Sequence, residues 1–244
     1  QKGGVGKTTT TINLGACLAE LGYRTLLVDL DPQGNASTGL GIDNRGLETS
    51  MYHVIMHEVP LENCIEPTSV KNLFVAPASL DLAGAEIELV PAFSRENRLR
   101  RAIEGVLDDF DYVLIDCPPS LGLLTVNGLT AATEVLVPIQ CEYFALEGLT
   151  QMIEVIRDVM QEQPGRLSFS GIVLTMHDAS LDLAAEVAEA LGQVDVRHLL
   201  AADRVVVVLV APLVEPHLRA DEVHARGGTL REREPLAVQV DRDR

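Results

Sequence analysis

The stretch KGGVGKTT, which runs from Lys2 to Thr9, is the part of the sequence that decides the fold. Three glycines in four positions let backbone N–H groups turn toward a polyphosphate, because no Cβ atom stands in the way. An apolar pattern with helical spacing runs from Gly6 to Leu21, so a helix N-terminus faces the same phosphates. The stretch therefore predicts a nucleotide-binding loop, with contacts from Gly3, Gly4, Val5, Gly6, Lys7, Thr8 and Thr9.

Two side chains of this loop have specific expected roles. Lys7 is expected to reach the β- and γ-phosphate oxygens, and the Thr8 hydroxyl to ligate Mg²⁺. A glycine-rich turn that only caps a helix is the weaker interpretation, because Gly-Lys-Thr stands directly before a helical pattern. The loop thus predicts ATP and Mg²⁺ as ligands.

Short apolar runs alternate with helical patterns along the rest of the chain. This alternation indicates an α/β fold with a doubly wound, mostly parallel sheet and helices on both faces. In such sheets, ligands bind at the carboxyl ends of the strands. We expect strands at 25–28, 73–76, 111–116, 135–139 and 170–175, and helices at 95–108, 121–132 and 145–160.

Acidic residues stand at two of these strand ends. Asp29 and Asp31 follow the run at 25–28, and Asp116 ends the run at 111–116. A carboxylate in this place can hold Mg²⁺ through water or orient an attacking water. Each aspartate alone would be explained better as a helix cap or a turn residue. The phosphate loop and the two acidic strand ends together favour a site.

The form Lys-Gly-Gly-x-Gly-Lys-Thr-Thr, with an additional lysine at position 2, resembles the deviant Walker A motif of the ParA/MinD family of ATPases. The resemblance implies that Lys2 reaches across a dimer interface to the nucleotide of the other subunit. It also implies that Asp31 positions the hydrolytic water, that Asp116 supports the metal through water, and that Asp29 lies near the metal shell.

Within this family, the segments Asp29–Asn35, Ile115–Gly122 and Leu174–Ala179 look like those of chromosome- and plasmid-partitioning ATPases (ParA, Soj). The resemblance implies an ATP-dependent homodimer that binds DNA without sequence preference. It also implies a centromere-binding partner of the ParB type that stimulates ATP hydrolysis. The expected location is cytoplasmic and nucleoid-associated, with no membrane partner.

Other interpretations fit less well. Members that select the division site (MinD) carry a C-terminal amphipathic membrane helix, and Arg231–Arg244 shows no apolar stripe. The nitrogenase-reductase branch holds an iron–sulfur cluster through cysteines, and Cys117 and Cys141 do not stand in a matching context, although spacing alone leaves that branch open. A nucleotide-binding switch or remnant, with neither ATPase nor DNA-binding activity, is the alternative from another class.

The similarity covers 1–182, which we interpret as the P-loop ATPase domain, and 183–244 is atypical. A phosphate loop normally follows a buried strand, and nothing precedes Gln1, so we expect an open central slot in the sheet and poor solubility. Phe and Tyr are absent after Phe169, and the family's adenine loop and DNA-contacting residues are not recognisable. Two interpretations of 183–244 stay open: a shifted reading frame, or a divergent subdomain with Val205–Ala211 as a buried strand.

Composition excludes several classes of protein. The formal net charge of −17 argues against nucleic-acid or anionic-membrane affinity over the whole surface. No apolar run reaches the roughly 18 residues of a membrane helix. The four cysteines are scattered, as expected for reduced thiols of a cytosolic protein. The basic cluster of Arg95, Arg98, Arg100 and Arg101 is interpreted as a salt-bridged surface, because acidic residues follow it at helical spacing.

Overall fold

The computed structural model describes residues 6–44, 46–140, 145–176 and 205–208. Within these ranges the strands form one sheet in the order β2-β3-β1-β4-β7-β5-β6. Every pairing is parallel except that of β2 with β3, so the predicted α/β class with a mostly parallel sheet is confirmed. The strands are β1 (Thr25–Asp29), β2 (Glu66–Pro67), β3 (Leu73–Ala76), β4 (Tyr112–Asp116), β5 (Glu134–Gln140), β6 (Ser168–Thr175) and β7 (Val205–Val208).

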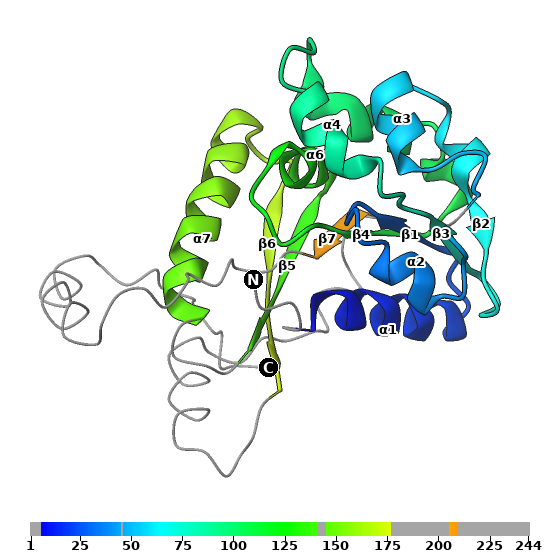
Figure 1. The fold of residues 1–244 in the computed structure, drawn as a ribbon. Coiled ribbons are helices and arrows are strands. Elements are labelled where there is room, and N and C mark those ends of the chain that lie inside the picture. The colour runs from blue at the N-terminus through cyan, green and yellow to red at the C-terminus, as the bar shows by residue number, and fades with distance from the viewer. Residues whose placement is uncertain (1–5, 45, 141–144, 177–204, 209–244) are drawn as a thin grey trace, which may run out of the picture.

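Helices lie on both faces of the sheet: α1 runs along one face, and α3, α4 and α6 cover the other (Figure 1). Short 3₁₀ turns connect several of them. The helices are α1 (Lys7–Glu20), α2 (Asn35–Gly39), α3 (Met51–His57), α4 (Leu82–Glu88), α5 (Arg98–Glu104), α6 (Leu123–Ala131) and α7 (Ala145–Glu162), and the turns are η1 (Leu61–Cys64), η2 (Arg95–Asn97) and η3 (Leu107–Asp109). Among the described helices, none is both long and apolar enough to cross a membrane.

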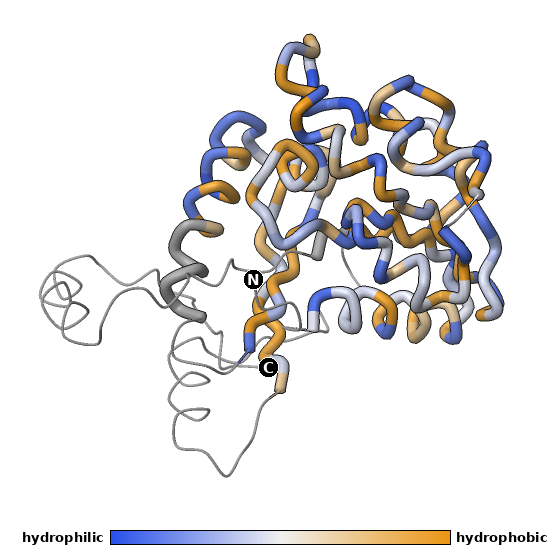
Figure 2. Tube along the Cα trace, viewed as in Figure 1, coloured by the Kyte–Doolittle hydropathy of each residue, from blue (hydrophilic) through white to orange (hydrophobic). Residues whose placement is uncertain are grey.

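Strand β1 shows why the sheet strands are continuous apolar runs. Leu26 and Val28 belong to the core under α3–α6, whereas Leu27 belongs to the separate core under α1 and α2. All three side chains are fully buried. A parallel strand covered on both faces needs apolar residues at every position, not at alternate ones. Figure 2 shows the resulting concentration of hydrophobic residues along the central strands.

The centre of the sheet is closed by a strand from the C-terminal region. Strand β7 pairs in parallel with β4 on one side and with β5 on the other. The expectation of an open central slot is therefore wrong, and the interpretation of Val205–Ala211 as a strand is confirmed for Val205–Val208. The facing edges of β4 and β5 carry N–H and C=O groups that need partners, and the β-branched residues of Val205–Val208 suit a strand that pairs with both. The prediction of poor solubility rested on that slot and loses its structural ground; the rest of 183–244 lies outside the described residues.

The single helix expected over 95–108 is also wrong. The segment divides into η2, α5 and η3, and α5 ends at Glu104 before Gly105. The Asn127 amide of α6 lies at the break between η2 and α5, where it accepts the Leu99 N–H and donates to the Arg95 carbonyl. These bonds fix the backbone where the helix would otherwise continue. The predicted apolar stripe is nevertheless real, since Leu99, Ile103 and Val106 are buried.

The basic cluster on this segment is paired, as the sequence indicates. Arg98 donates to the carbonyls of Ile55 and Met56 and forms an ion pair with Glu58 at 3.5 Å. Arg100 pairs with Glu104 at 3.6 Å. Further hydrogen bonds join Arg95 to Val90 and Arg101 to Ser94. These arginines are therefore engaged with neighbouring groups, and the exposed ion pairs among them contribute little to stability.

Candidate nucleotide-binding site

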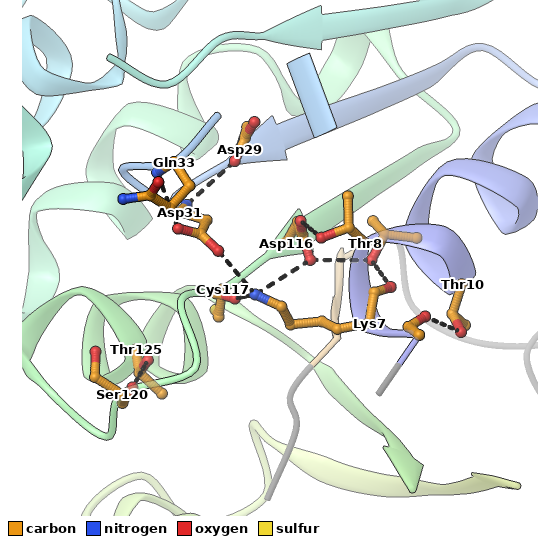
Figure 3. A network of polar contacts seen from close by, with 12 residues as sticks. Lys7, Thr8, Thr10, Asp29, Asp31, Gln33, Asp116, Cys117, Ser120 and Thr125 are labelled. Atoms are coloured by element: carbon orange, nitrogen blue, oxygen red, sulfur yellow. Dashed lines mark hydrogen bonds and ion pairs between the residues drawn. The ribbon is translucent and has the colours of Figure 1, made fainter. Parts of the chain in front are cut away.

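Three parallel strands bring the candidate site together at their carboxyl ends. Asp29 ends β1, Asp116 ends β4, and the two residues are direct partners in the strand register. Helix α1 begins at Lys7 beside these strand ends. Figure 3 shows Asp31, Asp116 and Cys117 arranged around the Lys7 ammonium, with the Asp29 carboxyl directed away from it.

Gly6 opens α1 in a conformation that favours glycine. Its φ is +84°, and its carbonyl accepts hydrogen bonds from the Thr10 N–H at 2.8 Å and the Thr10 hydroxyl at 2.7 Å. A Cβ atom at this position would lie 3.2 Å from Cγ2 of Thr175, at the end of β6. The backbone angle therefore favours glycine at position 6, and a Cβ there would also press against the Thr175 side chain at the end of a third strand. Of the other predicted loop contacts, Thr9 lies exposed on α1, and Lys2, Gly3, Gly4 and Val5 lie outside the described residues.

The ammonium of Lys7 is buried among oxygen atoms. The residue is 8% exposed, and its Nζ lies 3.3 Å from Oδ2 of Asp31 and 3.9 Å from Oδ1 of Asp116. It also donates a hydrogen bond to the carbonyl of Cys117. A buried cation needs such partners, because an unpaired charge away from water is costly. The structure thus joins three of the predicted residues in one network.

Thr8 places a hydroxyl next to a carboxylate. Its Oγ1 donates to Oδ2 of Asp116 at 2.8 Å, and Thr11 Oγ1 donates to Oδ1 of the same carboxylate at 3.4 Å. Burial raises the pKa of Asp116, while the nearby Lys7 charge and the Thr8 hydrogen bond lower it. Two hard oxygen donors from α1 and β4 are therefore adjacent.

Asp29 has different partners from its neighbour. Its Oδ2 accepts from the N–H of Ser37 at 2.8 Å and from the Ser37 hydroxyl at 2.7 Å, and its Oδ1 accepts from the Asp31 N–H at 3.1 Å. Burial, followed by the charge of Asp116, raises the pKa of Asp29 to about 7. In this arrangement Asp29 anchors α2 and the turn before it. Its place near the metal shell stays a prediction.

Two contributions to the site have no signal in the local sequence. The Cys117 carbonyl reaches Lys7 through the backbone, which carries no residue-specific pattern. Ser37, which lies on the short helix α2, binds Asp29 from eight residues away. The Cys117 thiol itself is fully buried and burial raises its pKa, in line with its interpretation as a small packing residue and not a nucleophile.

The donor set fits a magnesium ion held together with phosphates. No group of three or more His, Cys, Asp or Glu side chains in the described part of the chain could hold a metal by itself. Mg²⁺ usually takes one or two protein oxygens and completes its shell with water and phosphate oxygens. The adjacent Thr8 hydroxyl and Asp116 carboxylate supply such a pair.

These features are typical of a P-loop nucleotide-binding fold: a glycine at the start of a helix, a buried lysine, and aspartates at two adjacent parallel strand ends. A family model described as an AAA domain matches residues 1–169. The chain is 54% identical over 189 residues to the sporulation initiation inhibitor protein Soj of Bacillus subtilis, which covers 78% of this chain and 75% of that protein. It is 51% identical over 189 residues to the chromosome partitioning protein ParA of Myxococcus xanthus. That match covers 78% of this chain and 67% of the relative.

A solved structure supports the same assignment. The cobyrinic acid a,c-diamide synthase of Mycobacterium smegmatis, crystallised with an ATP analogue and magnesium, is 44% identical, with a TM-score of 0.73 and coverage of 77% of each chain. This chain belongs to the ParA/Soj family of P-loop ATPases. The resemblance stated from the Lys2–Thr9 motif is thereby confirmed.

Proposed function

We propose that this protein binds ATP with Mg²⁺, hydrolyses it, and acts in chromosome or plasmid partitioning. The observation that carries the proposal is the position of the Lys7 ammonium, which stands at the N-terminus of α1 between Asp31 and Asp116. Relatives named as chromosome partitioning proteins support the biological role.

The chemistry follows from what surrounds Lys7. Its ammonium contacts two carboxylates and the Cys117 carbonyl, so phosphate oxygens of ATP can replace the two carboxylates while the carbonyl stays in contact and the cation is not left unpaired. Asp31 is then free to orient the attacking water. Thr8 and Asp116 would hold Mg²⁺, which neutralises phosphate charge when bound. Catalysis of this kind depends on positioning and electrostatics, with no covalent intermediate.

The proposed cycle includes a second copy of the chain. Lys2 acts in trans on the nucleotide of the other subunit, so ATP closes a homodimer. This dimer binds DNA non-specifically, and a ParB-type protein stimulates hydrolysis and release. The expected location is cytoplasmic and nucleoid-associated. The names of the partitioning relatives support a partitioning role in general, and the individual steps are proposed from the resemblance of the Lys2–Thr9 motif.

ATP turnover of matched lysine variants tests the proposal. Lys7→Ala should abolish turnover, whereas Lys71→Ala, which removes an exposed lysine between β2 and β3, should leave it unchanged. Lys2→Ala should retain ATP binding but lose ATP-dependent dimerisation in analytical ultracentrifugation. Each measurement is made with and without DNA and a ParB-type partner. Equal turnover by the wild type and Lys7→Ala would contradict the ATPase assignment.

The alternative is a nucleotide-binding switch without hydrolysis. Direct titration with ATP and Mg²⁺ separates the two functions. Tight binding, with no phosphate release under any of the conditions above, would favour the switch. No binding at all would exclude both.

A further inference from the structure

The N-terminus of α6 is capped by a residue from another helix. Its N-cap residue is Gly122, and α6 has no side-chain cap of its own. Instead, the Glu86 carboxylate of α4 accepts the N–H of Leu123 at 2.7 Å and the N–H of Leu124 at 3.3 Å. A negative charge at the positive end of a helix, bound through two N–H groups, is a strong form of cap.

Gly122 lacks the Cβ atom that would obstruct this contact. A Cβ atom at that position would lie 2.3 Å from Oε2 and 2.4 Å from Oε1 of Glu86. The φ of Gly122 is −95°, which other residues adopt readily, so backbone strain does not explain the glycine. A side chain at 122 would therefore displace the Glu86 carboxylate, so glycine at this position leaves the space that the cap occupies.

The capped end of α6 terminates a segment that begins in the candidate site. Residues 117–122 join Asp116 to α6, and the carbonyl of Cys117 accepts the hydrogen bond of Lys7. Within the segment, the Ser120 carbonyl accepts from the Thr125 hydroxyl at 2.7 Å (Figure 3). The segment is thus held at the site by Lys7, in its middle by Thr125 and at its far end by Glu86.

We propose that Glu86 is a positioning residue for the reaction proposed above. By capping α6 it fixes residues 117–122, and through them the Cys117 carbonyl that orients the Lys7 ammonium. This inference rests on the proposed ATPase function. Loss of the cap lets the carbonyl move, and small displacements of a charged group near the reacting phosphate lower the rate more than the affinity.

Steady-state kinetics of the full chain separates positioning from general stability. Glu86→Ala should lower kcat about tenfold and change KM for ATP less than about threefold. Glu86→Gln keeps a hydrogen-bond acceptor and should recover most of kcat. Two controls should retain wild-type kcat: Glu88→Ala, which removes an exposed carboxylate of the same helix, and Ile103→Val, which weakens the buried core elsewhere.

Two further measurements do not need catalysis. Amide exchange at Leu123 and Leu124 should speed up in Glu86→Ala and not in Glu88→Ala. The NMR signal of the Lys7 ammonium, assignable because the chain has only three lysines, should shift in the same variant. Unchanged amide exchange at Leu123 and Leu124 in Glu86→Ala would show that Glu86 does not cap α6. Faster exchange with an unshifted Lys7 signal, or with unchanged kcat, would overturn the positioning role. If the wild type itself shows no turnover, the proposed function fails, and exchange and the Lys7 signal still decide the role of Glu86.

Discussion

Asp29 and Asp116 are neighbours across the β1–β4 register, yet their carboxylates bind opposite parts of the molecule. Asp116 faces the site, where Lys7 and Thr8 contact it. Asp29 faces Ser37 and the start of α2. Two acidic groups this close and this buried disfavour each other's charge, and Asp29 responds with a pKa of about 7.

This relationship predicts how stability depends on pH. The pKa of Asp29 is raised in the folded protein from 3.8, so at intermediate pH the folded state binds the proton that the unfolded state has lost. The contribution of this group to stability therefore falls as pH rises from about 4 to about 7, by at most about 1.4 kcal/mol per pH unit. Asp29→Asn removes the titration. Urea unfolding at about pH 5 and about pH 7 measures the free energy of unfolding of both proteins. Relative to the wild type, the variant should be more stable at about pH 7 than at about pH 5. The same stability difference at both pH values would contradict the raised pKa.

Gly6 gives a prediction that separates backbone strain from crowding. Gly6→Ala should destabilise the protein by more than about 1 kcal/mol, because the new Cβ meets both a positive φ and the Thr175 side chain. Gly165→Ala is the matched control, since Gly165 has a φ of +77° and open space around it. Thr175→Ser removes the crowding methyl group and should recover part of the difference in Gly6→Ala. Thermal unfolding of Gly6→Ala, Gly165→Ala, Thr175→Ser and the Gly6→Ala/Thr175→Ser double variant measures this, and equal losses for Gly6→Ala and Gly165→Ala would show that Thr175 plays no part.

Thr8 predicts the magnesium dependence. Thr8→Val keeps the shape of the side chain and removes the hydroxyl that lies 2.8 Å from Asp116. Turnover should then require more Mg²⁺, with a loss of about tenfold or more at saturating ATP, because one hard oxygen donor is gone. Thr8→Ser keeps the hydroxyl and should behave like the wild type. A magnesium titration of ATP turnover tests this, and identical midpoints for Thr8→Val and Thr8→Ser would contradict the metal role.

Strand β7 predicts a severe effect from one proline. Val206 lies opposite Leu114 on one side and Glu134 on the other, in the middle of the sheet. Val206→Pro removes an N–H from a strand that is paired on both edges and should cost about 3 kcal/mol or more. Val206→Thr keeps the branching at Cβ and is the milder comparison. Far-UV circular dichroism with chemical unfolding measures both, and a wild-type midpoint for the proline variant would show that β7 does not complete the sheet.

The sequence predicts best what local chemistry decides. Lys7, Thr8 and Asp116 are recognisable because closely spaced glycines before a Lys-Thr pair, followed by acids at strand ends, suit phosphate and magnesium binding better than a simple turn. The structure brings these three residues into contact. Contacts made by backbone atoms or over long separations leave no such pattern. The Cys117 carbonyl and the Glu86 cap are therefore visible only in the fold.

The errors have the same origin. The helix expected over 95–108 has a correct apolar stripe, but a single amide from Asn127 redirects its start. The position of Val205–Val208 in the sheet depends on which strand edges are unpaired, and this is a property of the assembled sheet, not of four valines. Periodicity predicts that an element exists, whereas distant partners decide where it ends and beside what it lies.

The place of β7 has a consequence for biosynthesis. The strands β1 to β4 can associate as soon as the first half of the chain has left the ribosome, whereas among the described strands β5 and β6 pair with them only through β7. We therefore expect the described strand pairing between the two parts to be completed only after Val208 has been made, with their inner edges open to other chains until then. Chaperone engagement on nascent chains should peak in this window and end once the valine run emerges.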